Sequence, residues 1–304
     1  MKHDEPIRQH YVPKLYLKRF AIKNNKKYEI YAYDKSKQKL FKTKIENVAL
    51  ENNFYTDENL SDKYYLEKYF GKKIEPNMEI FIRKLIKIYS SYNVLNNDYL
   101  MSDELKIEFS YIIIFIIFQL LRGKHTFEYG FKLAPVIVKE KAKLINERFG
   151  GVQLSMSDYF MEEVNQRGLV KNVLIEQLFN NDRMEFLTEI IFNKKWTIYV
   201  YSKDSLLTCD EPVIVRNSKT DKTKLFNVGL IKNHTEVYYA ITPRILIYLY
   251  DERTDKKSSD RSIRYVDDIS FANYYNKIVV DSCNAQIYSN DEELINSTLK
   301  CVKK

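Results

Sequence analysis

One apolar stretch, YIIIFIIFQLL from Tyr111 to Leu121, constrains the fold more than any other part of the sequence. Its side chains are apolar on every side of a helix, so the segment is stable only where the rest of the chain covers all its faces. It is shorter than the roughly 20 residues that a bilayer requires, and Gln119 interrupts it. We therefore predict a buried core helix rather than a membrane span. This helix begins near Ser102, a typical N-terminal cap, and ends at Gly123.

Upstream of this helix, helical and extended patterns alternate. Pro13 is placed to start a short helix. Residues 27–44 alternate apolar and polar side chains around a polar turn, which is typical of a β-hairpin. Helical periodicity then covers residues 61–90, with a break near Gly71 and a second start at Pro76.

Downstream, residues 124–194 are predicted to be largely helical, with a loop around Gly150. Between residues 195 and 250 the apolar segments are short, β-branched and aromatic, and turns separate them. They indicate strands of a mainly antiparallel sheet. Apolar residues recur at helical spacing from 271 to 279, which predicts a final helix.

These segments together predict an α+β fold with an N-terminal hairpin, a helical middle and a mainly antiparallel sheet in the C-terminal half. No internal repeat and no linker rich in Pro, Gly or Ser divides the sequence, so residues 1–304 are expected to form a single domain. A helical sub-lobe over about residues 61–194 is included in this expectation. Two closely packed lobes are the alternative.

The formal charge of +8 and the isoelectric point near 9.0 favour a polyanionic partner such as RNA or DNA. The alternative is a lysine-rich solvated surface, because the basic residues are spread along the whole sequence. Both interpretations stay open at the level of the sequence.

The three cysteines, Cys209, Cys283 and Cys301, lack the spacing of a metal site. Their odd, sparse count indicates reduced thiols, and no apolar leader is present near the N-terminus. We therefore expect a cytoplasmic protein with no membrane association.

The sequence contains none of the common nucleotide-binding or hydrolase motifs, such as GxxxxGK[ST], GxGxxG, HExxH or GxSxG. Its four histidines never lie three or four residues apart, which excludes a local pair of metal ligands on one helix. Residues that are distant in the sequence can still converge on one site.

Gln119 and Arg122 lie three residues apart at the end of the apolar helix, so they share one of its faces. A buried guanidinium is unfavourable unless it is paired, so Arg122 is expected to meet a carboxylate or to open onto a cavity. The alternative is that Arg122 caps the helix towards solvent, where a cation near the C-terminus is favourable.

Asp210 lies in SLLTCDEPVIV, where Pro212 interrupts an apolar strand pattern. A carboxylate at such a strand end can bind Mg²⁺ or orient a histidine that acts as a general base. In the alternative interpretation, Asp210 bonds the backbone of its own turn.

His10 precedes a Tyr-Val-Pro run, and its pKa near neutrality suits a general base, a phosphate contact or a metal ligand. A histidine that is simply packed in the core is the alternative.

Several segments in order resemble a mostly bacterial family that is named only as domain of unknown function 4238. The similarity rests on QHYVPKLYLKRF, ENVALENNFYT, FQLLR, LLTCDEPV and NKIVVDSCNAQIYS, which together span roughly residues 7–290. The family commonly has Thr-Ser-Asp-Asn-Pro-Val where this chain has Cys209 and Glu211 around Asp210, and it continues Arg-Thr where this chain has Gly123.

The resemblance implies that His10, Gln119, Arg122 and Asp210 contribute to one shared site. Glu67 and Glu75 are candidates for a further carboxylate there. It implies no activity, because the family name carries none.

The function that we expect is a hydrolase acting on nucleic acid, such as a nuclease or ribonuclease-like effector in bacterial antiphage defence or a toxin system. In this scheme His10 is the general acid and base, and Arg122 stabilises the charge of the transition state. Asp210 orients His10 or, with Glu75, holds Mg²⁺ or Mn²⁺. Gln119 and Arg19 contact the substrate. The alternative function is a non-catalytic module that binds a nucleotide or nucleic acid.

Overall fold

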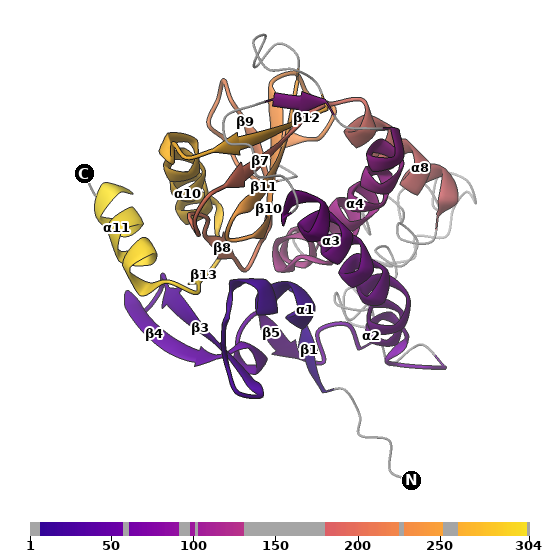
Figure 1. The fold of residues 1–304 in the computed structure, drawn as a ribbon. Coiled ribbons are helices and arrows are strands. Elements are labelled where there is room, and N and C mark those ends of the chain that lie inside the picture. Colours follow the sequence, from indigo (N-terminus) through magenta and orange to yellow (C-terminus); the bar gives the residue numbers. More distant parts are fainter. Residues whose placement is uncertain are drawn as a thin grey trace, which may run out of the picture.

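The computed structural model describes residues 7–56, 61–90, 98–100, 103–130, 180–224, 228–251 and 261–302. Its architecture is α+β, as the sequence predicts, with an N-terminal hairpin, helices in the middle and strands concentrated in the C-terminal half (Figure 1). The predicted loop around Gly150 and residues 131–179 of the predicted helical sub-lobe lie outside the described residues, as does Ser102. The single-domain organisation of residues 1–304 stays a prediction.

A six-stranded sheet forms the centre of the described structure, with the strand order β6-β12-β7-β11-β10-β9. All its pairs are antiparallel except β12 with β7, which is parallel. The strands are β6 (Asp98–Leu100), β7 (Lys195–Tyr201), β9 (Val213–Asn217), β10 (Thr235–Thr242), β11 (Ile245–Tyr250) and β12 (Ser262–Val266).

Helices lie on both faces of this sheet (Figure 1). On one face are α4 (Asp103–Arg122) and α8 (Asn181–Phe192), and the Phe109 ring of α4 stacks on Trp196 of β7 at 3.9 Å between centroids. On the other face α10 (Ser270–Ser282) packs Phe271 against Tyr199 at 4.6 Å. Trp196 and Tyr199 point to opposite faces because side chains alternate along a strand.

The predicted core helix is confirmed by the burial of the α4 side chains. Ile113 and Ile116 are fully buried, and Ile112 and Ile117 are almost so. No helix in the described ranges is long and apolar enough to cross a membrane. The apolar side chains on several sides of α4 are buried because the sheet covers one side of the helix and α3 (Glu75–Ser90) lies against another.

A second sheet joins the two ends of the chain. Its order is β2-β3-β13-β8. Strand β4 also pairs with β3, antiparallel to it, and the two strands form the predicted hairpin. The strands are β2 (Ile22–Asn24), β3 (Lys27–Asp34), β4 (Lys39–Lys44), β8 (Thr208–Cys209) and β13 (Gln286–Ser289). A C-terminal strand, β13, thus lies between an N-terminal strand and β8, and α11 (Glu292–Val302) follows it.

The N-terminal motif forms β1 (Arg8–His10), which pairs with β5 (Leu50–Asn52). Pro13 then caps the short helix α1 (Lys14–Leu17), as predicted, and a 3-10 turn over Lys18–Phe20 follows. Tyr16, Leu17 and Phe20 are fully buried and anchor this segment to the core.

The predicted break near Gly71 is wrong. Helix α2 (Tyr65–Tyr69) continues through a π-helical turn, Phe70–Ile74, directly into α3. Pro76 lies in the first turn of α3, where its missing N–H is tolerated because the wider π-helical turn has already shifted the hydrogen-bonding pattern.

Asn276 of α10 holds the segment that leads into β8. Its fully buried amide accepts a hydrogen bond from the Leu207 N–H at 2.9 Å and donates one to the Ser205 carbonyl at 2.8 Å. Since backbone groups that are buried without partners are unfavourable, this one side chain replaces a missing strand partner.

We predict that Asn276→Leu lowers the free energy of unfolding by about 2–4 kcal/mol, because two buried backbone groups lose their partner. Urea unfolding followed by circular dichroism measures the change. Asn273→Leu is the matched control, since Asn273 is exposed on the same helix and should change stability little. Equal effects of the two substitutions would contradict the role of Asn276.

Candidate functional site

The guanidinium of Arg122 lies in the core at the end of α4, with the residue only 3% exposed. Its Nη2 donates to the His10 carbonyl at 2.7 Å, and its Nε donates to the Tyr55 hydroxyl at 3.3 Å. Its Nη1 lies 3.4 Å from Oε1 of Glu75. The expectation that Arg122 is buried and meets a carboxylate is confirmed, and the solvent-capping alternative is wrong.

Aromatic rings cover the flat faces of this guanidinium. Its Cζ lies 4.3 Å from the centroid of Phe70 and 5.6 Å from that of Tyr55. The Tyr55 hydroxyl also donates to the Arg122 carbonyl at 2.8 Å. Cation–π contacts are strongest where water is excluded, so the rings favour the charged form of Arg122 inside the core.

Gln119 and Arg122 do share one face of α4, and both bind the backbone of the N-terminal motif. Gln119 Nε2 donates to the Tyr11 carbonyl at 3.0 Å, next to the His10 carbonyl that Arg122 binds. Gln9 completes this attachment, since its amide donates to Thr56 Oγ1 at 2.9 Å. Three polar side chains therefore fix the conformation of one short segment.

Two carboxylates lie beside the guanidinium, on either side of the π-helical turn. The side chain of Glu75 is 24% exposed, so it connects buried Arg122 with the surface. Glu67 is partly buried in α2, and its Oε2 is buried without a hydrogen-bond partner. Burial raises the pKa of Glu67 to about 7, although the charge of Arg122 opposes the shift.

His10 is 7% exposed, and its Nε2 lies 3.4 Å from the Ile45 carbonyl. Burial, with the nearby charge of Lys14, lowers the pKa of His10 to about 4. The ring is therefore neutral at pH 7, with Nε2–H as the donor to Ile45. The structure brings the backbone of His10, rather than its ring, into contact with Arg122.

Asp210 is fully buried and bonds a different segment. Its carboxylate accepts backbone N–H groups of Asn284, Ala285 and Gln286 at 2.9, 2.6 and 3.2 Å. The alternative of a local turn is wrong, because these groups lie 74 to 76 residues away in the sequence. Among the described residues, no hydrogen bond or ion pair joins Asp210 to His10 or Arg122.

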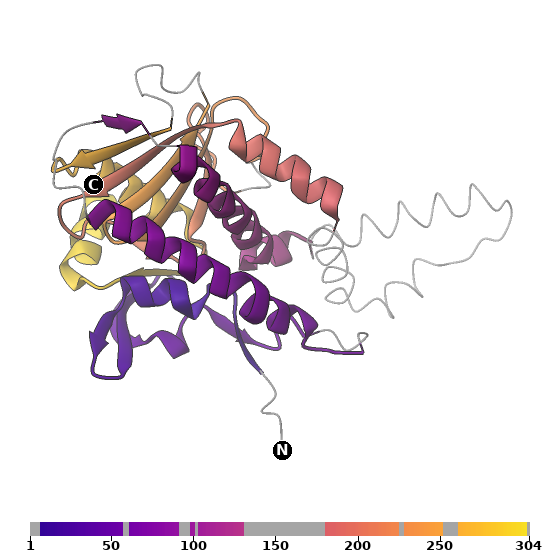
Figure 2. The same cartoon turned by 45° about the vertical axis from the view of Figure 1, so that its right-hand side comes forward.

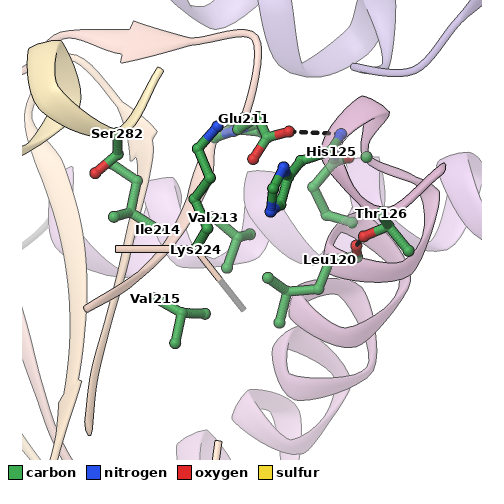
Figure 3. A pocket seen from close by; sticks show the side chains of 12 residues that line it. Leu120, His125, Thr126, Glu211, Val213, Ile214, Val215, Lys224 and Ser282 are labelled. Carbon is green, nitrogen blue, oxygen red and sulfur yellow. Dashed lines mark hydrogen bonds between the residues drawn. The ribbon is translucent and has the colours of Figure 1, made fainter. Parts of the chain in front are cut away.

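Glu211, which the sequence interpretation passed over, lines a small pocket between α4 and β9 (Figure 3). Its Oε1 accepts the backbone N–H of His125 at 2.7 Å. Burial, together with the negative charge of Asp210, raises the pKa of Glu211 to about 7, and Lys224 opposes this shift. The signal for this residue in the sequence is its place between Asp210 and Pro212, where the apolar strand pattern is interrupted.

A larger, open cleft lies between the N-terminal segment and α3. Its volume is roughly 560 Å³, and its lining consists of Leu15, Lys18, Arg19, Tyr28, Gly71, Glu75, Pro76, Glu79 and Arg83. In Figure 2, α3 lies across the indigo N-terminal elements that form the other wall. Glu75 belongs to this lining and touches Arg122, so the cleft and the buried guanidinium are neighbours.

Arg19, predicted to contact substrate, is in this cleft. Its Nη2 lies 3.0 Å from Oε2 of Glu79, and Arg83 Nε donates to the other oxygen at 2.5 Å. One carboxylate of α3 thus holds two guanidinium groups at the cleft.

In the parts of the chain that the structure describes, no group of three or more His, Cys, Asp or Glu side chains is arranged to hold a metal ion. The three cysteines are free, with Cys209 and Cys283 buried and Cys301 exposed. Roles of Asp210 and Glu75 in binding Mg²⁺ or Mn²⁺ stay predictions.

We predict that Glu211→Gln stabilises the protein at pH 8 by about 2 kcal/mol and leaves it nearly unchanged at pH 4. The pKa of Glu211 is higher in the folded state, at about 7, than its ordinary value of 4.5. The folded state therefore binds more protons between these values, and wild-type stability falls as the pH rises from about 4.5 through 7. The glutamine keeps an acceptor for the His125 N–H.

Urea unfolding at both pH values measures this difference. Glu46→Gln, at an exposed position, is the control. A Glu211→Gln protein that loses as much stability between pH 4 and pH 8 as the wild type would contradict the prediction.

Comparisons with known proteins identify the family of this chain. The chain matches the family model described as "Protein of unknown function (DUF4238)" over residues 8–293. No curated protein and no solved structure matches the chain. The matched region contains every candidate site residue described above, and it covers nearly all of the 304 residues. The chain belongs to the DUF4238 family of proteins of unknown function.

Proposed function

We propose that this protein binds nucleic acid through the open cleft between α1–β3 and α3, as a non-catalytic module. The observation that supports this proposal is the position of the chain's positive charge. Two stretches border the cleft, residues 14–28 and residues 70–90. The first contains six basic residues and no acidic one, and the second contains five basic and two acidic residues.

The rest of the chain is nearly neutral. Of the 49 basic and 41 acidic residues in the chain, these two stretches contain 11 and 2, which leaves 38 and 39 elsewhere. Three of the 11 basic residues, Lys18, Arg19 and Arg83, line the cleft itself. Ten of the 11 are exposed, and Arg19 is half-buried.

Such a local excess of exposed Lys and Arg suits a polyanion. Each phosphate that a basic side chain neutralises releases counterions, and this release supplies most of the sequence-independent affinity of nucleic-acid-binding proteins. Arg19 and Arg83 are held in place by Glu79, so part of the ordering of these side chains precedes binding.

A hydrolase acting on nucleic acid is the second proposal, and Glu67 is the observation that favours it. A carboxyl with a pKa of about 7 can exchange a proton at neutral pH, and Arg122 beside it is suited to stabilise negative charge. The scheme with His10 as general base and Asp210 as its orienting partner gains less support. The His10 ring is bound to Ile45, and the Asp210 carboxylate is bound to three backbone N–H groups.

We predict that Lys18→Ala with Arg83→Ala weakens nucleic-acid binding at least tenfold at low salt. The slope of log Kd against log salt concentration should decrease by about 1–2, since two phosphate contacts are lost. Fluorescence anisotropy with labelled single-stranded and duplex RNA and DNA at several salt concentrations measures both quantities.

Lys203→Ala with Arg244→Ala is the matched control. It removes the same charge from exposed positions outside the cleft, and Arg244 is paired with Asp204 much as Arg83 is paired with Glu79. If both double variants weaken binding equally, only net charge matters and the cleft is not the site. Absence of binding to every probe would refute the proposed function.

For the hydrolase, we predict that Glu67→Gln reduces cleavage by about 10²–10⁴-fold while binding is unchanged, because only proton transfer is lost. Gel assays of RNA, single-stranded DNA and duplex DNA with Mg²⁺, Mn²⁺ or chelator measure cleavage. Glu46→Gln is the control, and His10→Ala and Asp210→Asn test the roles expected from the sequence. No cleavage of any substrate by the wild type would exclude the hydrolase and leave the binding module.

A further inference from the structure

We infer that the cleft selects single-stranded over duplex nucleic acid by stacking an unpaired base on Tyr28. This inference rests on the proposed function and specifies the ligand of the same cleft. It is argued from the surroundings of Tyr28, from the acidic residues of the cleft and from the size of the cleft.

Tyr28 is an aromatic residue inside the basic cleft, on β3, where it pairs with Lys23 of β2. It is half-buried and packs against the hydrophobic core, which fixes the ring. The ammonium of Lys18 lies over the ring, 5.3 Å from its centroid. Because Lys18 is exposed, a base can take its place on the ring while the ammonium of Lys18 pairs with the adjoining phosphate.

The two carboxylates of the cleft oppose a ligand that presents only phosphates. Glu79 is occupied by Arg19 and Arg83, so it positions these cations. Glu75 contacts Arg122 through Oε1, and the rest of its partly exposed carboxylate faces the cleft that it lines. A carboxylate accepts hydrogen bonds from the N–H groups of bases, which are turned inwards in a duplex and available in a single strand.

The size of the cleft leads to the same conclusion. Its volume of roughly 560 Å³ is within the range of pockets that hold small ligands. Such a volume suits a single splayed base with its sugar and phosphate rather than a whole duplex. Base edges and aromatic faces are the features that proteins use to bind unpaired strands.

The test is anisotropy with a labelled single strand, the duplex of the same sequence, and the same single strand made abasic. Wild-type protein is expected to bind the single strand at least tenfold more tightly than the duplex or the abasic strand. Tyr28→Leu should weaken single-strand binding by about 5–100-fold and leave duplex binding unchanged, because one stacked base is lost. Tyr28→Phe should retain single-strand binding, since the ring face is kept.

Tyr31→Leu is the matched control. Tyr31 lies on the same strand, Lys42 lies over its ring at 5.7 Å, and it is absent from the cleft lining. It should leave all affinities unchanged, and thermal unfolding of both Leu variants monitors folding. Equal wild-type affinity for the three probes, or an equal effect of the two Leu variants, would overturn the inference while the proposed binding stands. No binding to any probe would refute the proposed function itself.

Discussion

The charge of Arg122 in the core is the constraint on which much of the structure depends. A buried guanidinium is tolerated only where its donors are satisfied and a counter-charge is near. Three distant segments meet this requirement: His10 through its carbonyl, Tyr55 through its hydroxyl and Glu75 through its carboxylate. The end of α4 therefore fixes where β1, the residues after β5 and the start of α3 lie. These three segments converge because each contributes to satisfying one cation.

The sequence predicted those elements whose pattern is local. The apolar run of α4, the alternation of β3 and β4 and the periodicity of α10 each specify an element without reference to the rest of the chain. The sequence could not predict the position of β13, because its place between β3 and β8 depends on Asp210 binding N–H groups 74 to 76 residues away. Gly71 was similarly misleading, since a π-helical turn accommodates it without ending the helix.

The candidate site shows the same division between local chemistry and long-range contact. The pairing of buried Arg122 with a carboxylate followed from the chemistry of an arginine at the end of an apolar helix, but the identity of that carboxylate as Glu75 did not. The cleft could not be predicted from the sequence, because its two walls come from separate segments. Arg19 and Glu79, which meet at the cleft, are 60 residues apart in the sequence. Asp210 and His10 have the residue types of an active site, yet their observed hydrogen bonds satisfy the backbone. A catalytic residue type alone therefore does not identify a site.

The charge around the cleft has a consequence for the approach of the proposed ligand. The two stretches that border the cleft contain 11 basic and 2 acidic residues. Under the proposed function, this local excess would raise the concentration of an anionic ligand near the cleft and steer its approach. Steering of this kind weakens as the ionic strength rises, because salt screens charges that are exposed to solvent.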